Sequence, residues 1–237
     1  MPIHNLTLVS KKTIAKQTIE FQFEKPENFN YLAGQYGGFT LINPPYTDQG
    51  GNTRRFSLVS SPDENTLALV TRIQPSAYKK NLEALNVGDQ MKFAGPTGNF
   101  ILHDDVSVPT IFIAGGIGIA PFYSMIKQVL AQNETREMVL FYGNQQLADT
   151  AYYAELCELA KTHANFKLVV TLANPEPEWT GEVGFITDAL VLKHAPKWEN
   201  SFIYVCGGPG MVGAMQAMLS ELGAAEDRIK VEDFPGY

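Results

Sequence analysis

Apolar and polar residues alternate with a period of two along the first hundred residues of the chain. The clearest case is residues 18–24, Thr-Ile-Glu-Phe-Gln-Phe-Glu, a pattern typical of a half-buried antiparallel strand. Similar runs predict strands at residues 4–9, 36–42, 55–60, 66–73 and 90–94. Glycine, proline and asparagine mark turns between them, and one helix is predicted at residues 77–85. Short, regular strands with a single helix indicate an antiparallel Greek-key β-barrel.

The pattern of apolar and polar residues changes near residues 103–105, His-Asp-Asp, and no long linker separates the two parts of the chain. Beyond them, predicted strands alternate with predicted helices. The strands are expected at residues 109–114, 137–142, 166–172 and 201–206, and the helices at residues 120–132, 148–162, 185–193 and 209–222. This alternation is typical of a doubly wound α/β fold with a parallel sheet. We therefore predict two domains, residues 1–104 and residues 105–237.

One corner of the second domain has the chemistry of an anion site. Residues 109–122 read Pro-Thr-Ile-Phe-Ile-Ala-Gly-Gly-Ile-Gly-Ile-Ala-Pro-Phe, so a buried strand is followed by three glycines and then by a helix with proline in its first turn. Glycine lets a ligand approach the backbone, and the start of a helix carries about half a positive charge. Such a corner suits a phosphate or a diphosphate. On its own, the pattern is equally typical of a structural strand-to-helix turn.

A barrel strand also carries candidate site residues. Residues 54–62 read Arg-Arg-Phe-Ser-Leu-Val-Ser-Ser-Pro and place cations, an aromatic ring and a hydroxyl in succession. Alternation predicts that Arg55 and Ser57 lie on one side of the strand and that Phe56 lies on the other. The alternative is a strand that simply has a polar face.

Residues 204–211, Tyr-Val-Cys-Gly-Gly-Pro-Gly-Met, form a second strand–glycine–helix corner. Cys206 stands at the carboxyl end of its strand, and ligands of open α/β sheets bind outside those ends. We therefore expect Cys206 to face a ligand. An inert buried thiol is the alternative.

Composition narrows the class of protein. The chain is 45% hydrophobic and 18% charged, as in globular proteins, and its net charge of −7 argues against nucleic acid as the main partner. No segment approaches the ~20 apolar residues of a membrane span, and the first residues lack a signal-peptide core, so we expect a cytoplasmic protein. Two cysteines and four histidines form no metal-ligand spacing, so no metal is expected.

In this order and spacing, the motifs resemble those of the ferredoxin–NADP reductase superfamily. The Arg-x-aromatic-Ser motif, the loop Gly-Gly-Ile-Gly-Ile-Ala-Pro-Phe and the Cys-Gly-x-Pro-x-Met motif carry the resemblance, which covers essentially the whole chain. The sequence is most similar to compact single-chain bacterial reductases, which also have Ser-Ala-aromatic-Lys before a helix, here residues 76–79. The resemblance implies an FAD-binding barrel followed by a domain for a nicotinamide dinucleotide.

For the flavin, the resemblance implies that Arg55 pairs with the FAD diphosphate and that Phe56 lies on the isoalloxazine. Ser57 is expected to hydrogen-bond near flavin N5. Many relatives have tyrosine at the position of Phe56, so a polar contact of those relatives has no counterpart here. The other residues expected at the flavin are Leu58, Thr71, Arg72, Ser76 and Ala77. Donors at the helix start favour FAD over FMN.

For the nucleotide, the resemblance implies that the glycine loop admits the diphosphate of NAD(P)H and that Cys206 lies beside the nicotinamide. Glu232 is expected to join Ser57 and Cys206 around the reacting atoms. Tyr237 is expected to cover the exposed flavin face, with a frayed terminus as the alternative. The other residues expected to bind a cofactor are Gly115, Gly116, Gly118, Ala120, Pro121, Asn144, Gly207, Gly208, Pro209 and Met211. Relatives often have two prolines where this chain has a glycine followed by a proline.

The implied reaction is hydride transfer from nicotinamide C4 to flavin N5 followed by electron release, with Ser57, Cys206, Glu232 and Tyr237 as catalytic residues. Residues 141–149 hold two neutral glutamines and an aspartate where a binder of the 2′-phosphate usually has arginine. This favours NADH over NADPH as the donor.

The acceptor is expected to be separate from this chain, because no clustered cysteines are present to hold an iron–sulfur centre. It would be a redox protein, such as a ferredoxin or flavodoxin, or a small molecule. Lys79, Lys80, Arg54 and Lys127 are candidates for docking an acidic carrier, with solvated surface charges as the alternative. The alternative function is a non-catalytic regulatory or electron-transfer subunit that binds flavin or nucleotide.

Overall fold

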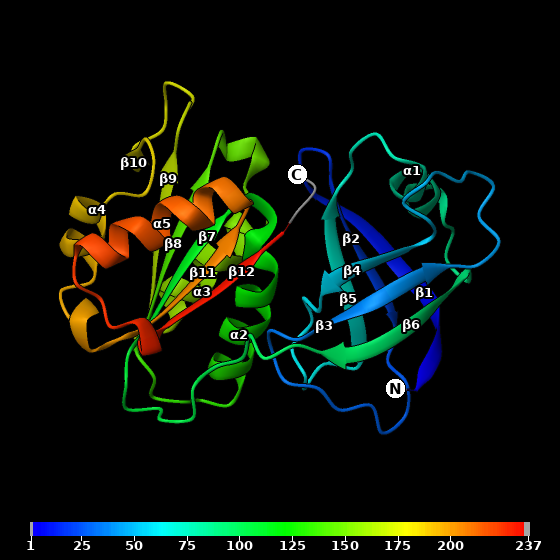
Figure 1. Cartoon of the computed structure of the whole chain (residues 1–237), viewed down its shortest axis with the longest axis horizontal. Helices are drawn as coiled ribbons and strands as arrows, with labels where there is room; N and C mark the ends of the chain where they lie inside the picture. Colours follow the sequence, from blue (N-terminus) through cyan, green and yellow to red (C-terminus); the bar gives the residue numbers. More distant parts are fainter. Residues whose placement is uncertain (1, 235–237) are drawn as a thin grey trace. The chain divides into compact units, whose positions relative to one another are not determined.

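The computed structural model of the chain describes residues 2–234 and divides into two compact units (Figure 1). The first unit comprises the residues up to Leu102 together with Tyr123–Gln128. The second comprises His103–Phe122 and the described residues from Val129 onward. The predicted fold class is confirmed, since the first unit holds an antiparallel sheet and the second a parallel sheet with helices.

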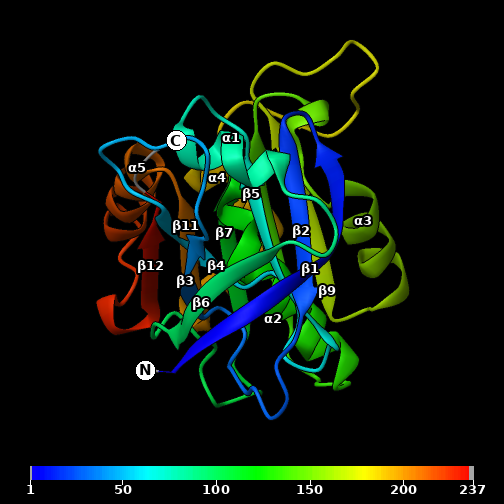
Figure 2. The same ribbon diagram turned by 90° about the vertical axis from the view of Figure 1, so that its right-hand side faces the viewer.

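The first unit is built on six antiparallel strands in the order β4-β3-β6-β1-β2-β5 (Figure 2). Neighbours in this order are often distant in sequence, as in a Greek key. Its elements are β1 (Ile3–Ala15), β2 (Thr18–Glu24), β3 (Tyr36–Leu41), β4 (Thr53–Ser57), β5 (Thr66–Arg72), α1 (Ala77–Ala84) and β6 (Gln90–Thr97). Strand β1 is longer than predicted, because a register shift between Leu8 and Ser10 interrupts its alternation.

Aromatic rings fill the interior of this sheet. The ring of Phe39 lies 4.9 Å from that of Phe93 and 5.9 Å from those of Phe23 and Phe56, measured between centroids. The alternation seen in residues 18–24 places Phe21 and Phe23 in this core, and both are fully buried. The core therefore fixes the inner face of β4, which bears the candidate site residues.

The second unit has six parallel strands in the order β10-β9-β8-β7-β11-β12. Its elements are β7 (Thr110–Gly115), α2 (Ile119–Ala131), β8 (Met138–Asn144), α3 (Tyr153–Thr162), β9 (Phe166–Leu172), β10 (Glu182–Val183), α4 (Asp188–His194), β11 (Phe202–Gly207), α5 (Pro209–Glu221) and β12 (Ile229–Asp233). The four predicted strands are present, and β10 and β12 were not predicted.

Helices cover both faces of the parallel sheet. Ile111 and Ile113 of β7 pack in one cluster with apolar residues of α4 and α5. On the opposite face, the ring of Phe112 lies 4.8 Å from that of Phe122 in α2. The chain adds β8, β9 and β10 on one side of β7, and β11 and β12 on the other. The strand order therefore reverses between β7 and β11, where open α/β sheets bind ligands.

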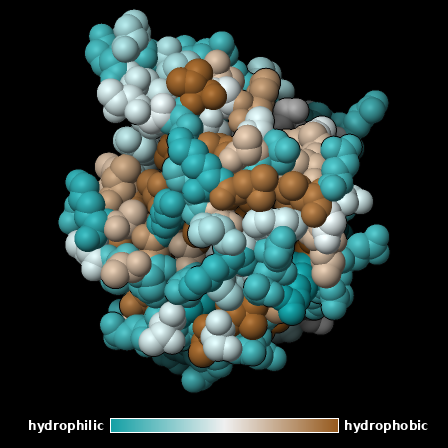
Figure 3. Space-filling view, turned by 90° about the vertical axis from the view of Figure 1, so that its left-hand side faces the viewer, coloured by the Kyte–Doolittle hydropathy of each residue, from teal (hydrophilic) through white to brown (hydrophobic). Residues whose placement is uncertain are grey.

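Some apolar surface stays exposed. Figure 3 shows apolar side chains gathered in a band across one face. In and next to the edge strand β10, Val183 is 65% and Phe185 is 77% exposed. Strand β10 has only two residues, so this edge of the sheet offers few backbone groups to another strand.

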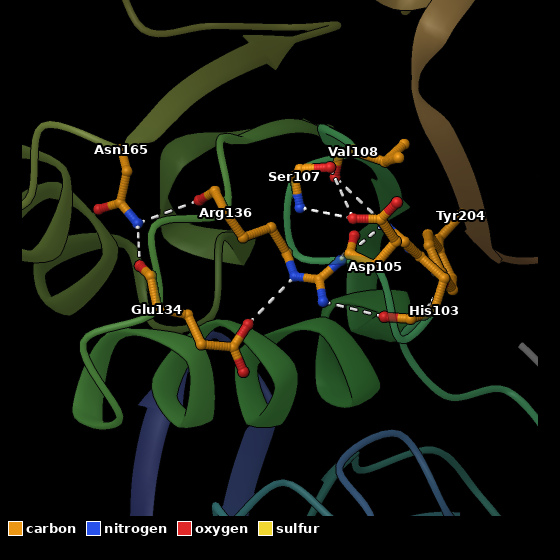
Figure 4. A network of polar contacts seen from close by, with 8 residues as sticks. All are labelled: His103, Asp105, Ser107, Val108, Glu134, Arg136, Asn165 and Tyr204. Atoms are coloured by element: carbon orange, nitrogen blue, oxygen red, sulfur yellow. Dashed lines mark hydrogen bonds and ion pairs between the residues drawn. The ribbon is translucent and has the colours of Figure 1, made fainter.

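A buried cation that the sequence did not reveal crosslinks the second unit (Figure 4). Arg136 is 2% exposed, and its Nη1 lies 2.6 Å from Nε2 of His103 while its Nη2 donates to the carbonyl of His103 at 2.9 Å. Its Nε pairs with Glu134 at 3.3 Å. The ring of His103 stacks on Phe202 at 4.1 Å, and the backbone N–H of His103 donates to the Tyr204 hydroxyl. The segment before β7 is thereby attached to the loop before β8 and to β11.

We expect this network to make stability depend on pH. Burial lowers the pKa of the His103 ring, and the charge of Arg136 lowers it further. The hydrogen bond to the carbonyl of Val108 favours the charged ring and raises the pKa in part. The neutral His103 ring therefore contributes its full share of the folding stability above about pH 6.5, the pKa of histidine in the unfolded chain. That contribution is lost as the pH falls through the lower pKa that His103 has in the folded protein. Urea unfolding at pH 7.5 and pH 5.5 should show a loss in the wild type that is smaller in His103→Gln. The control, His163→Gln, should lose as much stability as the wild type. If His103→Gln also loses as much as the wild type, His103 is not the source of the pH dependence.

Candidate functional site

Strand β4 carries three predicted flavin residues that differ in exposure. Arg55 is exposed, Phe56 is half-buried and Ser57 is 4% exposed. The ring of Phe56 lies 5.9 Å from that of Phe39 and 6.0 Å from that of Tyr78, so its inner edge packs on the core. The Ser57 hydroxyl is buried and has no hydrogen-bond partner among the described residues. A buried hydroxyl without a partner is the kind of group that a ligand satisfies.

Arg54 was not among the predicted binding residues, yet it shares the side of β4 that carries Phe56. Its Nη1 donates to the carbonyls of Gly50 and Gly51 at 2.5 and 3.2 Å, and its guanidinium lies 5.1 Å from the centre of the Tyr78 ring. Arg55 points to the other side, toward the ring of Tyr36. Spacing in the Arg-x-aromatic-Ser motif also selects Arg54, which stands three residues before Ser57.

The start of α1 lies close to this face. The Ser76 hydroxyl caps the helix by accepting from the N–H of Lys79 at 3.1 Å. The ammonium of Lys79 contacts the Thr71 hydroxyl and lies 4.8 Å from the centre of the Phe56 ring. Burial lowers the pKa of Lys79 to about 8, and the charge of Arg54 lowers it in the same direction. The structure thus gathers Phe56, Thr71, Ser76 and Lys79 in one region.

The remaining predicted flavin residues differ in exposure. Leu58 is fully buried in the core, and its N–H donates to the carbonyl of Gln35, so its side chain serves packing. Arg72 ends β5 and is half-buried. The four candidate docking cations do not form a free basic patch. Lys127 pairs with Glu64 at 2.5 Å, and the ammonium of Lys80 lies 3.6 Å from the centre of the Tyr46 ring. Arg54 donates to the carbonyls of Gly50 and Gly51, and Lys79 contacts the Thr71 hydroxyl.

The first glycine corner consists of β7, a short 3₁₀ turn at Gly116–Gly118, and α2. A Cβ atom on Gly118 would lie 2.2 Å from the carbonyl oxygen of Cys206, and one on Gly115 would lie 2.1 Å from the sulfur of Met211. Backbone atoms leave no room for a side chain on Gly118, and a side chain on Gly115 would displace the Met211 side chain, so both glycines serve the packing of the β7 corner against the β11 corner. Gly116 has φ +54° and open space around its Cβ position. A purely structural role of the turn thus explains Gly115 and Gly118, whereas Gly116 leaves the turn accessible to a ligand.

The first turn of α2 is apolar and buried. Ala120 is 3% exposed and Pro121 is also buried. Proline needs no hydrogen-bond acceptor in this turn, where backbone donors have no partner within the helix. These residues therefore position the glycine corner and the helix start.

The second corner runs from β11 into α5. Gly208 is the N-cap residue of α5 and offers no side-chain cap, Pro209 follows it, and no atom lies within 4 Å of a Cβ placed on Gly208. The N–H groups of this helix start are thus not capped by a side chain of the cap residue. Gly207 packs against Met211: a Cβ atom placed on Gly207 would lie 2.8 Å from the Met211 sulfur. The two glycine corners therefore flank the point where the strand order reverses.

Cys206 is fully buried, so the expectation that its thiol faces outward is not what the structure shows. Burial raises its pKa well above the usual value, and the carboxylates of Glu232 and Asp233 raise it further. The thiol is therefore protonated at neutral pH. The parallel pairing of β11 with β12 places Glu232 opposite Cys206 in the strand register. Tyr237 lies outside the described residues.

Asn144 stands at the carboxyl end of β8, next to the glycine corner of β7. It is 8% exposed, and neither atom of its side-chain amide has a partner among the described residues. The backbone carbonyl of Asn144 accepts the N–H of Ala173. The backbone N–H of Asn174 donates to the backbone carbonyl of Gln145, and its side-chain amide donates to the Gln145 side chain. The loops after β8 and β9 are therefore held together. Residues 144–160 and 173–187 contain no lysine, arginine or histidine.

These observations fit the groups that the sequence implied. In the first unit, a buried hydroxyl without a partner, a half-buried ring and a capped helix start suit an aromatic cofactor that carries phosphates. In the second unit, two open glycine corners and a buried amide suit a dinucleotide. Among the described residues, no cluster of three or more His, Cys, Asp or Glu side chains could hold a metal ion.

Comparisons with known proteins agree with both assignments. Residues 5–101 match the oxidoreductase FAD-binding domain, and residues 112–217 match the oxidoreductase NAD-binding domain. Phenol 2-monooxygenase reductase component DmpP of a Pseudomonas species is 34% identical over 91% of this chain and 60% of its own length. A subunit of the Na⁺-translocating NADH-quinone reductase of Serratia proteamaculans is 29% identical over 90% of this chain and 56% of its own length. The chain thus spans little more than half of these curated relatives.

A solved ferredoxin–NADP⁺ reductase from Neisseria gonorrhoeae superposes with a TM-score of 0.83 at 20% identity and covers 98% of both chains. The fold and the two matched domains define an FAD- and NAD-binding oxidoreductase. The chain belongs to the oxidoreductases that combine these FAD-binding and NAD-binding domains, and it has the fold of the solved ferredoxin–NADP⁺ reductase. The predicted reductase-like family and cofactors are confirmed. Within the part of the chain that the structure describes, no helix is both long and apolar enough to cross a membrane.

Proposed function

We propose that the protein transfers electrons from NADH through FAD to a separate acceptor. The observation that carries this proposal is the union, in one chain, of an FAD-binding domain with an NAD-binding domain whose two glycine corners flank the reversal of strand order. Bound FAD supplies the redox chemistry by accepting a hydride from the nicotinamide and releasing electrons singly or in pairs. The protein residues bind, orient and shield the reacting groups.

In the first unit, we assign the flavin contacts to Phe56, Ser57 and the start of α1. The half-buried ring of Phe56 offers a stacking surface, and the Ser57 hydroxyl offers a hydrogen bond that no described residue takes. Thr71, Ser76 and Ala77 add polar groups beside that ring. Arg54 supports phosphate binding from the side of β4 that carries Phe56, and Arg55 contributes from the exposed side.

In the second unit, Gly116 and the starts of α2 and α5 provide backbone donors for the NADH diphosphate. Gly115, Gly118 and Gly207 allow the two corners to approach each other. Cys206 stands at the carboxyl end of β11 as a neutral, fully buried thiol, so it acts on the nicotinamide side of the site as a dipole from behind the surface and not as a nucleophile. Glu232, its neighbour in the sheet, helps to keep that thiol protonated.

NADH is proposed as the donor because the adenosine end of the site lacks cations. Where the loops after β8 and β9 meet, the held side chains are Asn144, Gln145 and Asn174, and the nearby charged residues of these loops are acidic. Amides can bind the free hydroxyls of a ribose. A 2′-phosphate would need cationic partners, which these loops do not offer.

The acceptor is proposed to be a separate redox protein or a small molecule. DmpP is by name the reductase component of a monooxygenase, and the Serratia relative is a subunit of an NADH-quinone reductase. Both names describe a reductase that works with other subunits or components. We propose a cytoplasmic location, on the composition of the chain.

An absorbance spectrum under anaerobic conditions tests this function. The purified protein, loaded with FAD, should show an oxidised flavin spectrum that bleaches on addition of NADH, and at least about tenfold more slowly with NADPH. A flavin spectrum that neither nucleotide bleaches would favour the alternative, a non-catalytic regulatory or electron-transfer subunit. Failure to bind FAD at all would refute the proposal.

A further inference from the structure

The carboxylate of Asp48 occupies the anion position at the start of α1. Its Oδ2 accepts the N–H of Ala77 at 3.0 Å, and its Oδ1 accepts the N–H of Gly50 at 2.9 Å and lies 3.7 Å from Nη2 of Arg54. Asp48 belongs to the loop between β3 and β4, 29 residues before Ala77. The contact is therefore made by the fold and not by the sequence neighbourhood of the helix.

The helix needs an anion from elsewhere. Helix α1 has no acidic residue in its first turn, although a negative charge there stabilises a helix. Ser76 satisfies the N–H of Lys79, and Asp48 satisfies the N–H of Ala77. The same position is where the resemblance and the geometry assign the phosphates of FAD.

The charges around this position exceed what one carboxylate balances. The guanidinium of Arg54 lies 3.7 Å from the Asp48 carboxylate, and the ammonium of Lys79, from the first turn of α1, lies over the ring of Phe56. Arg54 and the helix start thus face the single charge of Asp48, and Lys79 adds a second cation beside the Phe56 ring. A diphosphate carries two negative charges and more acceptor oxygens, so it matches this set better.

The loop is built so that Asp48 can move away. Its residues are exposed from Tyr46 to Thr53, and the Asp48 side chain is 37% exposed. Asn81 holds the loop at Tyr46 through hydrogen bonds to both its N–H and its carbonyl. Gly50 and Gly51 follow Asp48, and Gly51 has φ +68° with no atom near its Cβ position. The loop is therefore fixed at Tyr46 on one side of Asp48. On the other side its two glycines are held through Arg54, itself a proposed phosphate ligand, so Asp48 and Arg54 are released together.

We propose that Asp48 is an internal anion that holds the flavin site of the apoprotein in order and is displaced by the FAD diphosphate. The proposal rests on the proposed function, since it assumes that the first unit binds FAD. Asp48 stabilises the start of α1 and orders Arg54 in the absence of the cofactor. It also competes with FAD, because its carboxylate and the diphosphate require the same donors.

The test compares Asp48→Asn with Asp89→Asn in the full-length apoprotein. Asp89 is a matched control, because its exposed carboxylate also accepts a backbone N–H, that of Asn86, but at a turn of the same unit that lies outside the flavin residues. FAD affinity is measured by quenching of flavin fluorescence, and apoprotein stability by the thermal midpoint. Asparagine keeps an acceptor for the N–H of Ala77 but removes the charge.

The expected result is a Kd for FAD about three- to tenfold lower in Asp48→Asn than in the wild type, with a lower thermal midpoint of the apoprotein. The Asp89→Asn variant should keep the wild-type Kd. An unchanged Kd in Asp48→Asn, or a higher one, would overturn the proposal; a higher value would make Asp48 a positioning residue for Arg54. If the wild type itself binds no FAD, the proposed function fails and this inference fails with it, whereas an unchanged Kd in Asp48→Asn beside a wild type that binds FAD refutes the inference alone.

Discussion

The substitution Gly118→Ala should destabilise the second unit by about 3 kcal/mol and weaken NADH binding at least about tenfold. A Cβ at this position would lie 2.2 Å from the carbonyl oxygen of Cys206, 2.6 Å from its carbonyl carbon and 2.8 Å from the nitrogen of Gly207. All three are backbone atoms, so no side-chain rotation relieves the overlap. The β7 and β11 corners must move apart, and both contribute donors to the proposed nucleotide site.

Urea unfolding and a titration with NADH measure the two effects. Gly213→Ala is the matched control, because Gly213 lies within α5 and no atom approaches its Cβ position. Alanine there should leave stability unchanged or raise it by up to about 1 kcal/mol, since alanine is a better helix former than glycine. A Gly118→Ala variant that unfolds at the wild-type urea concentration would show that the two corners are not in firm contact.

Replacing Arg136 with methionine should lower the free energy of unfolding by about 3–5 kcal/mol. Methionine preserves much of the length of the side chain but leaves the carbonyl of His103 and the carboxylate of Glu134 without their cation. Acceptors that lose a buried charged donor are costly, and the segment before β7 loses its attachment to the loop before β8.

The control for Arg136 is Lys161→Met, since Lys161 is 73% exposed and pairs weakly with Glu158 on α3. That substitution should change the free energy of unfolding by less than about 0.5 kcal/mol. Chemical denaturation of both variants at pH 7.5 makes the comparison. A loss of less than about 1 kcal/mol in Arg136→Met would mean that the cation is dispensable for the fold.

Periodicity was sufficient for the elements with a strong apolar pattern. Residues 18–24 alternate strictly, and β2 occupies those seven positions. Strand β12 was missed because its sequence, Ile-Lys-Val-Glu-Asp, is short and charged and lies at the edge of the sheet. Strand β10 has two residues, which no pattern can reveal. The order of strands was also beyond the pattern, since pairing joins segments that are distant in sequence.

The candidate site divides in the same way. The glycine corners could be located because tight strand-to-helix turns require glycine at fixed positions, and Gly115 and Gly118 meet that requirement. Arg136 and Asp48 gave no signal, since each looks like a surface charge until the fold brings a partner to it. The sequence pattern singled out Arg55 and not Arg54, because adjacent residues of a strand differ mainly in the side to which they point.

The burial of Cys206 has a consequence for the durability of a redox protein. Peroxide and alkylating reagents attack thiolates that they can reach, and Cys206 is both protonated and inaccessible. Its carboxylate neighbours on β12 reinforce the protonated state. A sulfur atom can therefore stand at the carboxyl end of β11 without becoming the residue at which oxidants inactivate the protein.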